Sequence, residues 1–183
     1  EDLWSCKNPS RAQKIAISHI KRPYVLLLSV LLHDVGKGLG GDHSAKGAKI
    51  ARRIVNGLGY GEDVAADVEF LVGSHLLFST LAFKRDMNDP SMIARFAETI
   101  RSEELLSMLY LLTYADIVAI GPSVWNSWKA NLMDILYNKT LDRLSKGEGA
   151  ALNEEKLLQS KIRSVESALG GISARAELKK HLD

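Results

Sequence analysis

The stretch LLLSVLLHDVGKGLGGDHS, from Leu26 to Ser44, decides the fold of this 183-residue chain. It begins as the most apolar part of the sequence and then places His33 and Asp34 side by side. The glycine-rich run that follows is incompatible with a continued helix. A second pair of an aspartate and a histidine, Asp42 and His43, comes just after the glycine-rich run. We therefore expect a buried helix of about ten residues that ends near His33 and Asp34, followed by a loop.

Apolar residues recur at helical spacing along almost the whole chain, and runs of alternating β-branched residues are absent from the sequence. The pattern predicts an all-α fold. Ser44, Asp89 and Ser102 are each expected to cap a helix, and residues 82–89 and 146–149 are expected to be loops. The predicted helices cover residues 10–20, 23–33, 45–58, 62–78, 90–100, 103–120, 122–144, 153–169 and 172–182.

Composition excludes some classes of function. The 24 basic and 22 acidic residues leave a formal charge of only +2, which argues against a nucleic-acid partner. A single cysteine rules out an internal disulfide and suits a reducing, cytoplasmic location. The longest apolar run, residues 24–32, is too short to cross a membrane. The chain lacks an initiator methionine, and we interpret it as a piece of a longer protein.

Three predicted helices direct a titratable residue toward the core. His75, Asp116 and Asp34 each occupy the next position on an apolar stripe, and His33 adjoins the last of them. The stripe before His75 consists of Val64, Val68, Leu71 and Val72. The stripe before Asp116 consists of Leu105, Leu109 and Leu112, and the stripe before Asp34 consists of Leu26 and Val30. A buried carboxylate without a partner costs several kcal/mol, so two of them require cations. The stripes carry no lysine or arginine, whereas imidazoles and carboxylates from several helices suit a divalent transition metal.

Each residue also has an ordinary structural interpretation when it is taken alone. His33 could cap its helix, and Asp34 could accept hydrogen bonds from the loop amides. His75 could be a hydrogen-bonded core histidine, and Asp116 could bond a neighbouring aromatic side chain. His43 could be a solvated residue before a helix. All of these interpretations would have to hold together to remove the case for a metal.

The motif HDVGKG, residues 33–38, resembles the HD-domain superfamily of metal-dependent phosphohydrolases. His33 and Asp34 match the doublet that names the family, and Asp116 in TYADI matches its distant aspartate. His43 in GDHSAKGA and His75 in GSHLL match two further histidines that many members insert. The resemblance implies an HD-domain helical bundle with a C-terminal helical extension. It also implies two divalent metal ions (manganese, magnesium, iron or zinc) that share Asp34.

Three longer stretches, residues 26–48, 72–98 and 111–137, are similar to the HD domain of the bacterial PII uridylyltransferase/uridylyl-removing enzyme family. That resemblance implies hydrolytic release of UMP from a tyrosine of the uridylylated PII signalling protein. It also implies partner domains outside this sequence, a nucleotidyltransferase domain and ACT domains. The expected organisation is an N-terminal segment over 1–22, the HD phosphohydrolase domain over 23–147 and a helical connector over 148–183.

One departure from the family pattern concerns the first metal histidine, which should lie on a helix well before the doublet. The only earlier histidine is His19, close to the doublet and in a different segment. We expect the true first ligand to lie upstream of this sequence, with His19 as the alternative.

Other residues near the motif are assigned catalytic or binding roles from their positions in the sequence. Asp34 and Lys37 are assigned to catalysis, with Lys37 on the phosphate oxygens, since a point charge suits an anion. Lys37, Asp42, Lys84 and Arg85 are assigned to substrate binding, although the lysines and the arginine could also be plain surface residues. Asp42 could instead orient His43. Trp125 and Trp128 could stack on a base, although core packing behind Asp116 is the alternative that we favour.

Three rival functions remain open from the sequence. The same scaffold could be a nucleotidase or phosphodiesterase acting on a free nucleotide. It could also be a regulatory helical module with an incomplete site. A di-iron oxygenase is a third alternative, which nothing in the sequence favours.

Overall fold

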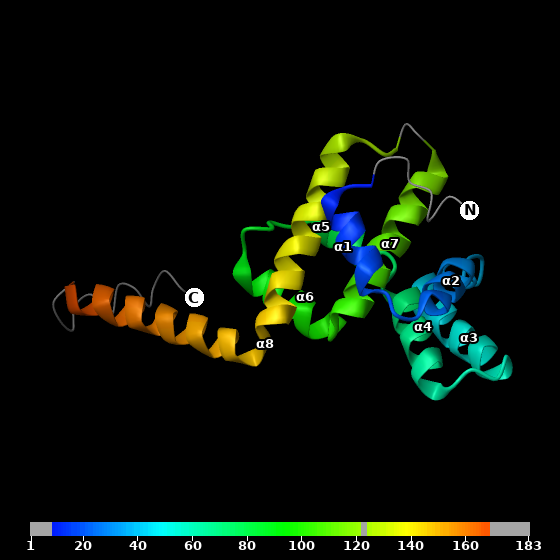
Figure 1. The fold of residues 1–183 in the computed structure, drawn as a ribbon, viewed down its shortest axis with the longest axis horizontal. Coiled ribbons are helices and arrows are strands. Elements are labelled where there is room, and N and C mark those ends of the chain that lie inside the picture. Colours follow the sequence, from blue (N-terminus) through cyan, green and yellow to red (C-terminus); the bar gives the residue numbers. More distant parts are fainter. Residues whose placement is uncertain (1–8, 122–123, 169–183) are drawn as a thin grey trace. The chain divides into compact units, whose positions relative to one another are not determined.

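The computed structural model describes residues 9–121 and 124–168 of the chain (Figure 1). Within these ranges the backbone forms helices joined by loops and contains no strand, which confirms the predicted all-α fold. The chain divides into two compact units, Glu1–Ser145 and Lys146–Asp183. The helices are α1 (Arg11–His19), α2 (Pro23–Leu32), α3 (His43–Gly57), α4 (Glu62–Ser74), α5 (Leu77–Lys84), α6 (Pro90–Ile100), α7 (Glu103–Ile120) and α8 (Ser127–Ala168).

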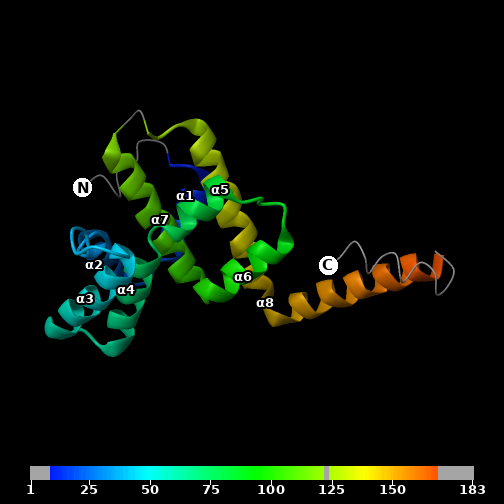
Figure 2. The same ribbon diagram turned by 180° about the vertical axis from the view of Figure 1, so that it is seen from behind.

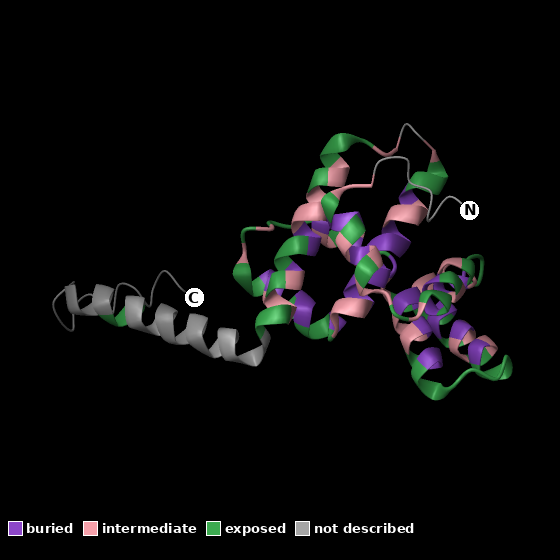
Figure 3. Ribbon diagram, viewed as in Figure 1, coloured by how far each residue is buried: buried purple, intermediate pink, exposed green. Residues whose placement is uncertain are grey.

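Four helices of the first unit bring the candidate site residues together. α3 packs along α4, while α2 lies against both α4 and α7, as the two opposite views agree (Figures 1 and 2). The faces that these helices turn toward one another are buried (Figure 3). The apolar stripes predicted on α4 and α7 belong to this core, and Val68, Leu71 and Leu109 are fully inaccessible. The stripes therefore point toward the core, as the periodicity predicts.

The turn between α1 and α2 is held by one arginine. The Arg22 guanidinium donates to Asp67 on α4 at 2.7 Å and to Glu104 on α7 at 3.2 Å. Glu104 also accepts the backbone N–H groups of Lys21 and Arg22, at 2.8 and 2.9 Å. Burial alone raises the pKa of Glu104, but these donors outweigh it, so the pKa of this carboxyl lies below its ordinary value. The cluster fixes where α2 begins relative to α4 and α7.

Two predicted helix caps are confirmed and one is wrong. Asp89 caps α6 and Ser102 caps α7, as expected, through bonds to the backbone N–H groups of Ser91 and Leu105. α3 is capped by Asp42, not by Ser44, because the Asp42 carboxylate accepts the N–H groups of the second and third helical residues. A charged acceptor also interacts favourably with the positive end of the helix. His43 is consequently the first residue of α3.

Other helix limits also differ from the prediction, and the helix expected to begin at 122 begins at Ser127 as α8. The helix expected over 62–78 stops at Ser74, and α5 begins at Leu77 after a break at His75. α5 runs to Lys84, so residues 82–84 are helical. The expected break at 146–149 is not present, since residues 127–168 are helical throughout. A glycine in a helix costs about 1 kcal/mol, which helix-forming neighbours can offset. The helix expected over 172–182 lies outside the described residues.

The stretch Glu62–Lys84 has the length and hydropathy of a membrane span, as does the bent pair α1 and α2. The stretch consists of two helices, however, and its side chains Val68 and Phe78 are fully buried. Core helices of soluble proteins meet the same two criteria, so this finding is weak evidence for a membrane segment.

Candidate metal centre

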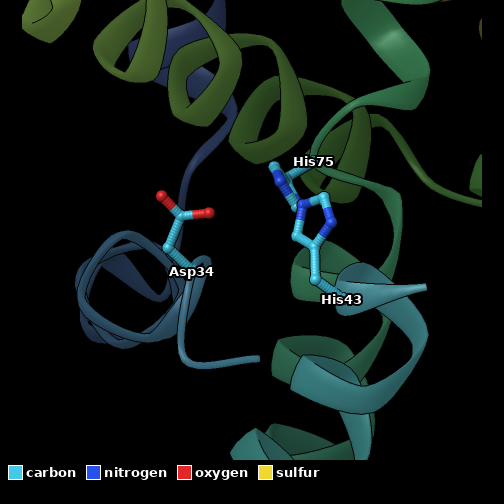
Figure 4. A group of neighbouring side chains, drawn as sticks. All are labelled: Asp34, His43 and His75. Atoms are coloured by element: carbon cyan, nitrogen blue, oxygen red, sulfur yellow. The ribbon is translucent and has the colours of Figure 1, made fainter. Parts of the chain in front are cut away.

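Three side chains from separate elements converge on one another. Asp34 lies in the turn after α2, His43 begins α3 and His75 follows the last residue of α4. One donor atom of each lies within 4.8 Å of the others, and Figure 4 shows the three side chains directed toward one another. The His75 ring packs edge-on against the rings of His33 and His43, with centroids 5.5 and 5.6 Å away.

His75 is only 2% exposed, and its ring orientation is fixed by a backbone carbonyl. Its Nδ1 lies 2.7 Å from the carbonyl oxygen of Val72. A carbonyl oxygen can only accept, so Nδ1 carries the proton and donates it. In the neutral ring, Nε2 then keeps a free lone pair. A metal-binding histidine typically has this arrangement, in which the second nitrogen is bonded to a carbonyl or carboxylate.

His33 repeats the arrangement at the end of α2. Its Nδ1 lies 2.8 Å from the carbonyl oxygen of Val30, and its Nε2 lies 3.2 Å from Asp34 and 3.5 Å from Asp116. In the neutral ring, Nε2 and the two carboxylates are all acceptors, an arrangement that either a bound divalent cation or a proton on Nε2 would satisfy. Asp34 belongs to this contact and to the group with His43 and His75, and it therefore links all five candidate ligands.

Both rings are oriented for the same local reason. The last carbonyl groups of a helix have no intrahelical partner. A histidine that directly follows an apolar helix can donate to the carbonyl three residues earlier, as His33 does to Val30 and His75 does to Val72. The bonds agree with the interpretation of His33 as a helix cap and of His75 as a hydrogen-bonded core histidine, although the two carbonyl acceptors were not predicted. The signal that could have found them is the position of each histidine immediately after an apolar helix.

Lys37 contacts the shared carboxylate. Its ammonium lies 2.5 Å from Asp34, while most of its side chain (70%) is exposed. Burial raises the pKa of Asp34, but the hydrogen bond and positive charge of the Lys37 ammonium outweigh it and hold the pKa below its ordinary value. The bond to Asp34 raises the pKa of Lys37. The two side chains are therefore oppositely charged at neutral pH.

Other predicted site residues contact different parts of the chain. The Asp42 carboxylate bonds the first turn of α3, next to His43. Lys84 and Arg85 are exposed at the end of α5, and Arg85 borders a groove of about 580 Å³ between α5 and α6. No contact between either cation and the metal-ligand candidates is present in the described part of the chain.

The two tryptophans lie in different surroundings. Trp125 is partly buried and packs edge-on against Tyr114, with ring centroids 5.0 Å apart. Trp128 is 59% exposed and stacks on Phe83. The core packing that we favour is therefore found for Trp125 but not for Trp128.

His19 does not reach this centre. Its Nδ1 lies 3.4 Å from the Tyr137 hydroxyl and its Nε2 3.5 Å from Glu103. Glu103 begins α7, and Asp116 follows it thirteen residues later, which corresponds to about 20 Å along a helix. The structure therefore does not support His19 as a substitute for the first metal histidine.

The donor set suits a divalent transition metal. Imidazole nitrogens favour manganese, iron or zinc over calcium, while carboxylates accommodate all of these and magnesium. One face of the group is protected from water by the buried His75 ring, and the other is open at the partly exposed Asp34 and His43.

These observations define a helical domain with a His/Asp centre able to hold a divalent metal, and residues 10–118 match the family model described as HD domain. The chain belongs to the HD-domain family. Over 143 residues it is 47% identical to the bifunctional uridylyltransferase/uridylyl-removing enzymes of Burkholderia mallei (strain ATCC 23344) and Burkholderia pseudomallei (strain K96243). The match covers 78% of this chain, which spans about 17% of the length of these relatives. No solved structure matches the chain.

Proposed function

We propose that this chain is a metal-dependent phosphodiester hydrolase that releases UMP from the uridylylated PII signalling protein in the cytoplasm. The observation that carries the proposal is the meeting of His33, Asp34, His43, His75 and Asp116, drawn from separate elements, around one shared carboxylate. The choice of uridylyl removal rests on the 47% identity to enzymes named for it, and the choice of PII rests on the family resemblance of the sequence.

Five side chains are the proposed ligands of two divalent ions. Asp34, His43 and His75 would hold one, and His33 and Asp116 would hold the other together with Asp34. When bound, such ions lower the pKa of a water ligand and neutralise charge on the phosphoryl oxygens. The chain prepares the site for them by directing the Nδ1–H of His33 and His75 to carbonyl groups, which leaves each Nε2 free to ligate.

The reaction needs little acid catalysis from the protein. Water attacks phosphorus, the bond between phosphorus and the tyrosine oxygen breaks, and UMP and the tyrosine side chain are released. A tyrosinate is a good leaving group, because its conjugate acid has a pKa of about 10. Lys37 binds the phosphate oxygens, since its ammonium lies beside Asp34 on an exposed side chain.

The remaining assignments concern the partner and the rest of the protein. Lys84 and Arg85 are exposed cations that contact the PII substrate. Asp42 supports His43 by capping the helix that His43 begins. The catalytic domain covers residues 23–147, preceded by a segment over 1–22 and followed by a connector over 148–183. A nucleotidyltransferase domain and ACT domains complete the parent protein.

A substrate panel tests the proposal. The purified chain with Mn²⁺ would be given uridylylated PII and, separately, a set of free nucleotides, and released UMP or nucleoside would be quantified. We expect release of UMP from PII, its loss in Asp116→Asn and its retention in Glu98→Gln, an exposed carboxylate on α6. Turnover of free nucleotides alone would favour the nucleotidase, and bound metal without any turnover would favour a regulatory module.

A further inference from the structure

The turn after α2 and the start of α3 touch through backbone atoms. A Cβ added at Gly36 would overlap the carbonyl oxygen of His43 and would lie 2.7 Å from the nitrogen of Gly47. Real Cβ atoms essentially never show contacts below 3.0 Å. Gly36 is buried and comes two residues after Asp34, so this contact joins the segment of one candidate ligand to the backbone of another.

We propose that Gly36 is a positioning residue, which sets the separation between the Asp34 carboxylate and the His43 imidazole. The proposal rests on the metal centre of the proposed function. Only a hydrogen at this position lets the turn approach α3 closely enough, because the facing atoms belong to the backbone of His43 and Gly47 and have no rotamer with which to move aside. Any side chain at 36 must therefore displace α3 or the turn itself.

A small displacement has a large effect on metal binding. The donor atoms of Asp34, His43 and His75 lie within 4.8 Å of one another, and metal bonds to nitrogen and oxygen are about 2.0–2.2 Å long with a tolerance of about 0.2 Å. His75 is held separately by α4, so a shift of α3 or of the turn changes the distances among the three donors. The expected loss is in metal affinity and coordination geometry.

Glycine-to-alanine variants along the same segment provide a graded test. At Gly36 the added Cβ meets backbone below 3.0 Å, and at Gly47 it lies 3.2 Å from the nitrogen of Gly36. At Gly57, the last residue of α3, it meets nothing within 4 Å. Mn²⁺ affinity would be measured by calorimetry, geometry by the visible absorption of Co²⁺-loaded protein, and stability of the metal-free protein by urea unfolding.

We expect Gly36→Ala to weaken Mn²⁺ binding by about 10- to 100-fold. We expect a smaller loss for Gly47→Ala and wild-type affinity for Gly57→Ala. The Co²⁺ spectrum should change in the first two variants only.

A folded Gly36→Ala protein with wild-type affinity and spectrum would overturn the proposal. If Gly36→Ala does not fold, Gly47→Ala decides: weaker binding with unchanged metal-free stability supports the proposal, and unchanged binding refutes it. Because no step measures hydrolysis, the result is independent of the identity of the substrate.

Discussion

The Nδ1 atom of His75 lies 2.7 Å from the carbonyl oxygen of Val72, one helical turn earlier on α4. The same relationship holds between His33 and Val30 at the end of α2. Two helices thus end with an imidazole whose Nδ1 is bonded to the backbone, which leaves Nε2 as the nitrogen able to ligate. The helix termini, not a distant side chain, determine the tautomer of both proposed ligands.

Replacing His75 with alanine should remove metal. The lost donor belongs to the group with Asp34 and His43, so Mn²⁺ affinity should fall by more than about a hundredfold, since changes outside the coordination shell already cost about 10- to 100-fold. Elemental analysis and calorimetry measure this directly. His19→Ala is the matched control, because His19 contacts Tyr137 and Glu103, and it should retain wild-type metal content. Equal metal content in the two variants would contradict the assignment of His75.

Lys37→Ala should separate metal binding from turnover. A charge-assisted hydrogen bond is worth about 1.5–3 kcal/mol, so kcat/KM for uridylylated PII should fall by about 10- to 100-fold while metal remains bound. Lys49→Ala, an exposed lysine on α3, is the control and should leave kcat/KM unchanged. Unaltered kinetics in Lys37→Ala would show that this ammonium does not contact the phosphate.

Much of this centre follows from sequence periodicity. The stripes on α4 and α7 predict His75 and Asp116 on core-facing positions because a helix repeats every 3.6 residues. The structure buries His75, whereas the Asp116 side chain is 29% exposed and lies beside His33. The break at His75 could not be predicted in this way, since the apolar pattern continues past it into α5. The cap at Asp42 was missed because Ser44 is an equally good cap by residue type, and only the fold selects between them.

Glu104→Gln should destabilise the fold in a pH-dependent manner. A carboxyl whose pKa is lowered on folding stabilises the protein above its unfolded-state pKa of about 4.3, and this contribution is lost as the pH falls through the lower folded-state pKa. We expect the variant to lose about 1–2 kcal/mol of unfolding free energy at pH 7. The difference from wild type should shrink as the pH falls below about 4.3. Urea unfolding across pH measures it, with Glu98→Gln as the control, and a gap that stays constant with pH would contradict the role given to Glu104.

Removing metal should lower the stability of the wild-type chain and leave the stability of a variant that lacks the metal ligand Asp34 unchanged. An ion that binds only the folded state stabilises it by about 2.7 kcal/mol when its concentration is a hundred times the dissociation constant. Thermal unfolding with Mn²⁺ and then with a chelator should therefore show a lower midpoint in chelator for wild type, and the same midpoint in both for Asp34→Ala. The comparison is specific because Asp34 is the one carboxylate common to both groups of candidate ligands in the described part of the chain. A wild-type midpoint that does not respond to chelation would show that the acceptors around His33 and His75 are satisfied without a divalent ion, and it would favour the regulatory module over the hydrolase.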